Sequence, residues 1–181
     1  MNINALLPEI QTGDYALFRG HSVMSAGIEW LAKVTDSKWV SKFGVYSHIA
    51  KFFWEQGQLN VAEMWDVGGY RDLRAVARLK EYDGLCFFAP APHIVRDNPM
   101  GTFFMINEFR ITPALQHYGN STLGLVALSD LTNIHIHPDS VQSVCSGFCQ
   151  HCDEACGMTF DRLFAPSDYL AIIDKVVPIE L

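Results

Sequence analysis

Four of the five cysteines in this chain lie within twelve residues near its C-terminal end, at Cys145, Cys149, Cys152 and Cys156. Clustered thiols can hold a metal ion, form disulfide bridges, or provide one reactive nucleophile among packed neighbours. Their spacing of four, three and four residues places all four side chains on one stripe of a helix. The geometry of such a helix therefore decides which of these roles is open to them.

A helix over residues 143–156 disfavours a single metal site. At a rise of 1.5 Å per residue its first and last cysteines are about 16 Å apart, whereas thiolate ligands lie about 2.3 Å from a zinc ion. A zinc site would need a break in the helix, or two of the cysteines together with His135, His137 or His151. Disulfides along one helix are also poor, because the two Cβ atoms must approach to about 4 Å.

Cys145 differs from the other three cysteines because it lies at the start of the predicted helix. The positive end of the helix dipole favours a thiolate, which is the nucleophilic form of cysteine. The other three are expected to be buried free thiols, a common state for cysteine, and so is Cys86 in an apolar strand. The cluster thus contains one candidate nucleophile, with a packed thiol as the alternative reading of Cys145.

A nucleophilic cysteine needs a nearby imidazole, and the imidazole needs a group that orients it. His48 lies in the apolar run YSHIA, where a buried core histidine is the alternative. Gln56 and Gly57 separate this run from a second one, which predicts a hairpin with strands at 45–54 and 58–65.

In that hairpin Ala50 lies opposite Glu63. His48 and Glu63 then share one face as diagonal neighbours, about 7–8 Å apart at the backbone, which a hydrogen bond between the side chains can span. A slip of one residue would put them on opposite faces, and a solvent-facing glutamate is the alternative. His135 and His137 lie on the same face of another predicted strand. They are candidates for a competing base or a pair of metal ligands, although a strand face exposed to solvent is the simpler interpretation.

The elements that must position these residues are short strands mixed with helices. Residues 70–80 fit a turn followed by either a strand or a helix. Hairpin-type local pairing favours an α+β fold over a doubly wound sheet. Besides the hairpin and the cysteine helix, we expect strands at 14–19, 84–92, 133–137 and in the tail after 170, and helices at 22–36 and 102–110.

Composition limits the class of protein. The length of 181 residues suggests one domain, and 49% hydrophobic with 18% charged residues excludes bulk disorder. Thirteen Lys and Arg against 20 Asp and Glu give a net charge of −7, so neither nucleic acid nor an anionic membrane is an expected partner.

The compartment is predicted from what the sequence lacks. It has no secretory signal and no apolar run of about 20 residues, so we expect no stable membrane insertion. An odd number of cysteines without a signal indicates reduced thiols and a cytoplasmic location, with release by cell lysis as a further possibility.

Taken together, these motifs resemble the circularly permuted NlpC-type cysteine peptidases and amidases with a papain-like fold (YiiX-like). GDYALFRGHSVMSAGIEWLAKVTDSKW followed by YSHIAKFF resembles the opening of the family, and VAEMW stands where it carries a third polar residue. VCSGFCQ resembles the helix with the catalytic cysteine, and PSDYL the closing segment. The resemblance touches residues 13–66 and 143–170, in the permuted order His, Glu, Cys.

The resemblance implies a single permuted papain-like α+β domain over 1–181, with the catalytic Cys helix packed on an antiparallel sheet. Cys145 would be the nucleophile, His48 the general base and then acid, and Glu63 the residue that orients His48. The candidates for an oxyanion-binding side chain are Tyr118 and Tyr46, beside the backbone N–H of Cys145.

The resemblance also implies a function without any cofactor or metal. The protein would be a cysteine hydrolase that cleaves amide bonds through a thioester, in peptidoglycan stem peptides or in other amide or acyl substrates. The partner would be a small peptide, an amide or an acyl lipid. The alternatives are an acyltransferase or lipid hydrolase of the lecithin–retinol acyltransferase type, a non-enzymatic scaffold, or a metal-binding module.

Overall fold

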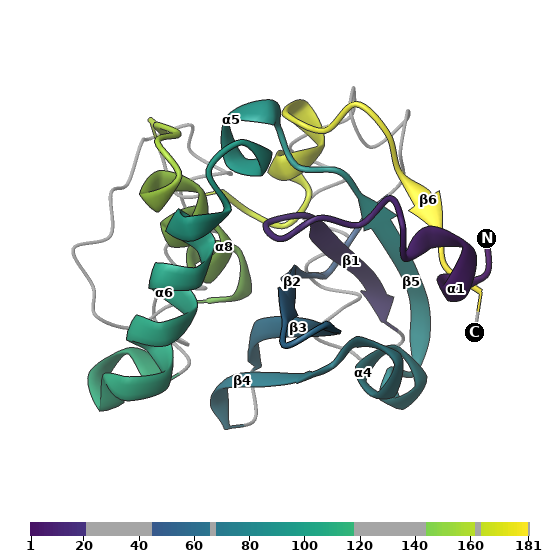
Figure 1. Ribbon diagram of the computed structural model, residues 1–181, viewed down its shortest axis with the longest axis horizontal. Helices are drawn as coiled ribbons and strands as arrows, with labels where there is room; N and C mark the ends of the chain where they lie inside the picture. Colours follow the sequence, from purple (N-terminus) through teal and green to yellow (C-terminus); the bar gives the residue numbers. More distant parts are fainter. Residues whose placement is uncertain (21–44, 66–67, 118–143, 162–163, 181) are drawn as a thin grey trace.

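A six-stranded antiparallel sheet forms the centre of the protein, with the strand order β4-β3-β2-β1-β5-β6 (Figure 1). The computed structural model describes residues 1–20, 45–65, 68–117, 144–161 and 164–180. The strands are β1 (Tyr15–Gly20), β2 (His48–Glu55), β3 (Gln58–Trp65), β4 (Gly69–Arg74), β5 (Gly84–Ala89) and β6 (Val177–Pro178).

Helices cover both faces of this sheet. The two longest described helices, α6 and α8, lie side by side on one face, and the short helices α1 and α4 pack against the other (Figure 1). The helices are α1 (Ile3–Leu6), α4 (Ala75–Glu81), α5 (His93–Arg96), α6 (Pro99–Ile111) and α8 (Cys145–Ala155), with 3-10 turns η1 (Pro113–Gln116) and η2 (Asp168–Ala171).

Successive side chains of the central strands point to opposite faces of the sheet, so the core is divided into two clusters. In β1, Tyr15 and Leu17 pack toward α6 and α8, whereas Ala16 and Phe18 belong to the cluster with α1 and α4. Strands that are buried on both faces need apolar residues at almost every position. This explains why the sequences of β1 and β2 read as nearly continuous hydrophobic runs.

The β2–β3 hairpin has the register that its turn predicts. Gln56 and Gly57 connect the strands with φ angles of 51° and 75°. Two successive positive φ angles are typical of the type I′ turn, which fits the twist of a two-residue hairpin. Lys51 lies opposite Ala62, which confirms the predicted register, and the first strand begins at His48 rather than at residue 45.

Helix α8 confirms the predicted cysteine helix, which begins two residues later than expected, at Cys145. Gly157 follows the C-cap residue Cys156 with a φ of 104°, the left-handed conformation that a glycine adopts after a helix end. All five cysteines are buried and free. The thiols on this helix therefore lie along one buried stripe.

The remaining predictions for the described residues hold with shifted ends. The expected helix at 102–110 begins earlier, at Pro99, because proline is tolerated in the first turn of a helix. Residues 70–80 form a strand followed by a short helix, and the tail contributes only two residues of strand. The expected helix at 22–36 and strand at 133–137 lie outside the described residues.

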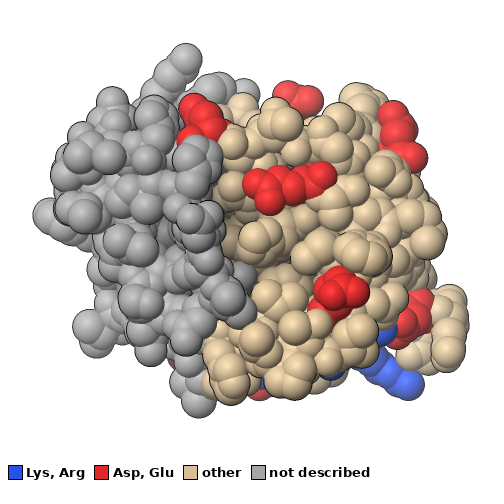
Figure 2. Space-filling view, turned by 90° about the vertical axis from the view of Figure 1, so that its left-hand side faces the viewer, with Lys and Arg blue, Asp and Glu red and all other residues tan. Residues whose placement is uncertain are grey.

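The α+β class is thus confirmed, as an antiparallel sheet with helices packed against it. Acidic side chains are scattered over the described part of the face seen in Figure 2, where few basic groups appear. Among the described helices, none has the length and apolar character needed to cross a membrane.

Candidate active site

His48 is the first residue of β2, and its side chain forms the expected contact with Glu63. The imidazole Nε2 lies 2.7 Å from Glu63 Oε2. The rings of Phe18 and Trp65 lie on neighbouring strands, each with its centroid 5.4 Å from that of the imidazole. Since the residue is only 9% exposed, these contacts hold the ring in one orientation.

Glu63 is almost fully buried, at 1% exposure, and accepts hydrogen bonds from three side chains. Besides His48, Arg78 donates to it from Nε at 2.5 Å and from Nη2 at 3.0 Å, and Arg71 donates from Nε at 2.7 Å. Burial raises the pKa of Glu63, but the hydrogen bonds and charges of His48 and Arg78 outweigh it and lower the pKa to about 2. Glu63 is therefore a carboxylate at neutral pH.

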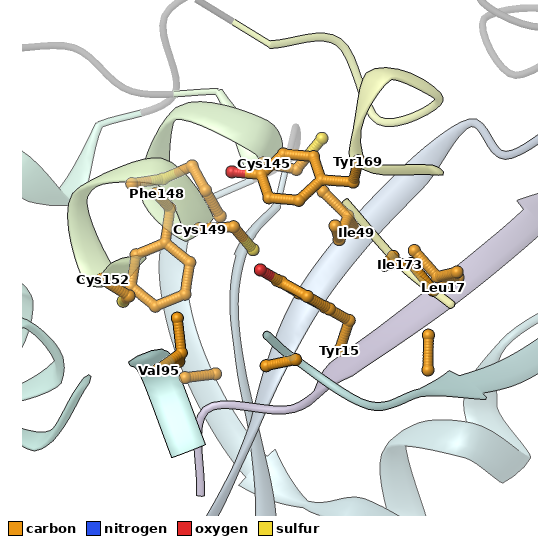
Figure 3. Packing of buried hydrophobic residues seen from close by; sticks show 14 of the residues in the cluster. Tyr15, Leu17, Ile49, Val95, Cys145, Phe148, Cys149, Cys152, Tyr169 and Ile173 are labelled. Atoms are coloured by element: carbon orange, nitrogen blue, oxygen red, sulfur yellow. The ribbon is translucent and has the colours of Figure 1, made fainter. Parts of the chain in front are cut away.

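Cys145 brings the third side chain to this group. It is the first residue of α8 and belongs to the core cluster drawn in Figure 3. Burial lowers the pKa of His48, but the charge of Cys145, a hydrogen bond to its thiol and the contact with Glu63 together raise it to about 9. The structure thus brings Cys145, His48 and Glu63 together.

The two ring nitrogens of His48 have different tasks in this arrangement. Because Nε2 is bound to Glu63, Nδ1 is the nitrogen left to exchange a proton with the thiol. The position of His48 at the beginning of β2 explains how groups from both faces can reach it. Glu63 and the neighbouring rings approach from the face of α4, and Cys145 comes from the helix on the other face.

The other cysteines of α8 are packed as expected. Burial raises the pKa of Cys149 and of Cys152, so both remain thiols at neutral pH. The Sγ atom of Cys156 lies 3.5 Å from Thr102 Oγ1 of α6. Figure 3 shows Cys149 and Cys152 among aromatic rings of the cluster, whereas Cys145 interacts with the imidazole of His48.

Metal binding receives no support from the described residues, which contain no group of three His, Cys, Asp or Glu arranged for an ion. The alternative ligands His135 and His137 lie outside the described residues. His151 Nδ1 lies 3.6 Å from Glu154 Oε2, and both side chains are about 40% exposed.

The two oxyanion candidates have different outcomes. Tyr118 lies outside the described residues. Tyr46 lies two residues before the start of β2, outside the strand that carries His48. Its ring packs edge-on against Phe87, in the core cluster that contains Cys145. Burial raises the pKa of Tyr46 to about 12 although Arg19 lowers it, so the hydroxyl stays protonated and can donate a hydrogen bond.

Sequence reasoning missed the two arginines that bind Glu63. Arg71 lies directly opposite Glu63 in the β3–β4 pair, so extending the pairing by one strand would have found it. Arg78 comes from the following helix α4, and the sequence contains no local signal for its contact with Glu63.

No protein-family model matches this chain, and no curated protein matches it.

Proposed function

We propose that this protein is a cysteine hydrolase that cleaves amide bonds through a thioester at Cys145. The observation that carries the proposal is the environment of His48. Its imidazole interacts with the thiol of Cys145, while its Nε2 is held 2.7 Å from the buried carboxylate of Glu63. A nucleophile, a base and a group that orients the base are the components of such catalysis.

The reaction begins with proton transfer from the Cys145 thiol to Nδ1 of His48. The thiolate then attacks the carbonyl carbon of the amide, and the resulting tetrahedral oxyanion collapses with cleavage of the C–N bond. His48 gives its proton to the leaving nitrogen, which departs as an amine. Water, deprotonated by the same imidazole, attacks the thioester and releases the carboxylic acid and the free thiol.

Backbone groups at the start of α8 are suited to stabilise the oxyanion. The first N–H groups of an α-helix have no acceptor within the helix, and they carry the positive end of its dipole. Because Cys145 is the first residue of α8, its own N–H is such a group. Tyr46, or Tyr118, would supply the second donor.

The fold proposal is the permuted, papain-like NlpC type. It is supported by the helix of Cys145, which packs against β2 and β3, the strands that carry His48 and Glu63. The motifs in the sequence follow the permuted order of that family. The proposed substrates are those the resemblance implies, namely peptidoglycan stem peptides or another amide or acyl compound.

The first experiment measures alkylation of the native protein by iodoacetamide, with each cysteine followed by mass spectrometry. We expect Cys145 to react faster than the other four by at least about tenfold, since it interacts with the imidazole of His48. The His48→Ala variant should lose that advantage. Equal rates for all five thiols would contradict the proposal.

The second experiment tests turnover on stem-peptide fragments and on acyl lipids. We expect Cys145→Ala and His48→Ala to lower kcat by about 10⁴-fold, whereas the matched control Cys149→Ala keeps most of the activity. Trapping an acyl-enzyme with a phospholipid donor, followed by transfer to an amine or lipid, would instead favour the acyltransferase. No turnover and no acyl-enzyme with any donor would favour a non-enzymatic scaffold.

A further inference from the structure

Two positively charged side chains converge on the single carboxylate that orients His48. Arg78 and Arg71 both donate from Nε to Glu63 Oε1, and Arg78 also donates to Oε2, the atom that contacts His48. With one negative and two positive charges, this group has a formal charge of +1 beside the imidazole. Arg78 is 1% exposed, so water screens its charge little.

Glu63 therefore differs from a carboxylate whose only partner is a histidine. An unshared carboxylate stabilises the imidazolium and makes it a poor acid, whereas a cation nearby has the opposite effect. The imidazolium of the proposed hydrolase must release its proton to the leaving amine. Glu63 has to orient His48 without holding that proton too tightly.

We propose that Arg78, assisted by Arg71, is a positioning residue that acts through Glu63: it fixes the carboxylate against His48 and takes up part of its charge, so that His48 can release its proton. The reason for this role rests on the proposed hydrolase function. The contacts themselves are independent of it.

The elements packed against His48 contribute further groups to its surroundings. Helix α8 contributes Cys145, and β1 contributes the uncharged ring of Phe18. From the region of α4, Glu81 lies 3.6 Å from Arg71 and partly offsets its charge. On β5 burial raises the pKa of Cys86 to about 11, so it is a neutral thiol at pH 7.

Tyr82, at the end of α4, completes these surroundings, and its ring lies beneath the guanidinium of Arg78. Arg78 and Arg71 are therefore the described cations whose removal changes the field at the imidazole.

The test is a titration of the His48 ring by NMR in the full-length protein. A Cys145→Ala background removes the charge and the hydrogen bond of Cys145, which both contribute to the raised pKa of His48. We expect Arg78→Met to raise the pH midpoint of His48 by about one unit, because a nearby positive charge that opposed the imidazolium is lost. Arg78→Lys should return the midpoint to within a few tenths of the parent, since it restores the charge.

Matched variants separate this effect from general damage. Arg110→Met removes another arginine that pairs with carboxylates, Glu55 and Asp72, and should leave the His48 midpoint unchanged. If Arg78→Met does not fold, Arg71→Met decides, with a smaller rise in the same direction because Arg71 is more exposed. An unchanged or lower midpoint, or an equal rise in Arg110→Met, would overturn the proposal.

The proposed function and this inference can fail separately. The His48 midpoint is measured without any substrate, so a protein without turnover still reports whether Arg78 acts on His48. If turnover is found, Arg78→Met should lower kcat and extend the alkaline limb of its pH profile, and Arg78→Lys should restore both. Turnover with an unchanged profile would overturn the inference and leave the hydrolase intact.

Discussion

His48 is the residue on which the candidate site depends, because it connects two side chains from different elements. Its contact with Glu63 could be predicted from the sequence, since a two-residue turn fixes the register of a hairpin and a register fixes which residues share a face. The contact with Cys145 could be proposed only from the family resemblance. No local pattern relates a strand near residue 48 to a helix near residue 145.

The altered pKa values at this site predict how stability depends on pH. The pKa of His48 is raised from 6.5 to about 9 in the folded protein. A raised pKa stabilises the fold fully below pH 6.5, and this contribution disappears as the pH rises toward 9. Glu63, whose pKa is lowered from 4.5 to about 2, stabilises the fold above pH 4.5 and loses this contribution in acid.

We therefore expect the wild-type protein to be more stable than His48→Gln at pH 6, by on the order of 1–3 kcal/mol. The difference should shrink between pH 6.5 and 9. Urea unfolding of both proteins at several pH values measures it. A difference that grows in this range would show that His48 is neutral in the folded protein.

At the scale of elements, helix α8 is fixed to the sheet by a buried ion pair. Lys51 Nζ on β2 lies 2.5 Å from Asp153 Oδ1, and Tyr15 donates a hydrogen bond to Oδ2 at 2.9 Å. Lys51 and Asp153 are both 0% exposed. Their contact sets the position of α8 along β2, and hence the position of Cys145 relative to His48.

Removing Lys51 leaves the buried carboxylate of Asp153 with the hydrogen bond from Tyr15 but without its opposite charge. Lys51→Met should therefore lower the free energy of unfolding by about 3–5 kcal/mol, and the double variant Lys51→Met/Asp153→Leu should recover much of this loss. Lys175→Met is the matched control, because its pair with Glu9 is exposed and worth at most about 1 kcal/mol. Urea unfolding measures all three. A double variant that is no more stable than Lys51→Met would show that the loss does not come from the unpaired charge of Asp153.

The elements differ in how well the sequence predicts them. The stripe of cysteines predicts α8 because a period near 3.6 extends over three turns. Residues 70–80 remain ambiguous because β4 and α4 are both short, and Arg74, the N-cap residue of α4, makes no capping hydrogen bond. Arg78 lies on this helix, so its contact with Glu63 could not be found without the structure.

At the scale of the whole molecule, the first and last described residues lie side by side (Figure 1). The amino group of Met1 donates a hydrogen bond to the carbonyl oxygen of Pro178 at 2.7 Å. The N–H of Ile3 donates one to the carbonyl oxygen of Glu180 at 3.1 Å. Because the ends are adjacent, the order of the elements along the chain can be changed without changing their arrangement in space.

A circular permutant tests this expectation. Joining residues 181 and 1 by a short Gly/Ser linker and opening the chain between the exposed Asp97 and Asn98 places Cys145 before His48. We expect the permutant to fold, with a loss of no more than about 2 kcal/mol, because closing a short loop costs little. Urea unfolding and the alkylation rate of Cys145 measure the outcome. A protein that folds but has lost selective alkylation would show that chain order positions α8.

Trp65 gives the site a spectroscopic property. The guanidinium carbons of Arg71 and Arg78 lie 4.5 and 4.6 Å from the centroid of its ring, and the imidazole of His48 meets the ring edge-on. A protonated imidazole quenches indole fluorescence more strongly than a neutral one. The fluorescence of Trp65 should therefore increase as His48 loses its proton. The intensity of this emission then reports the charge of the candidate base.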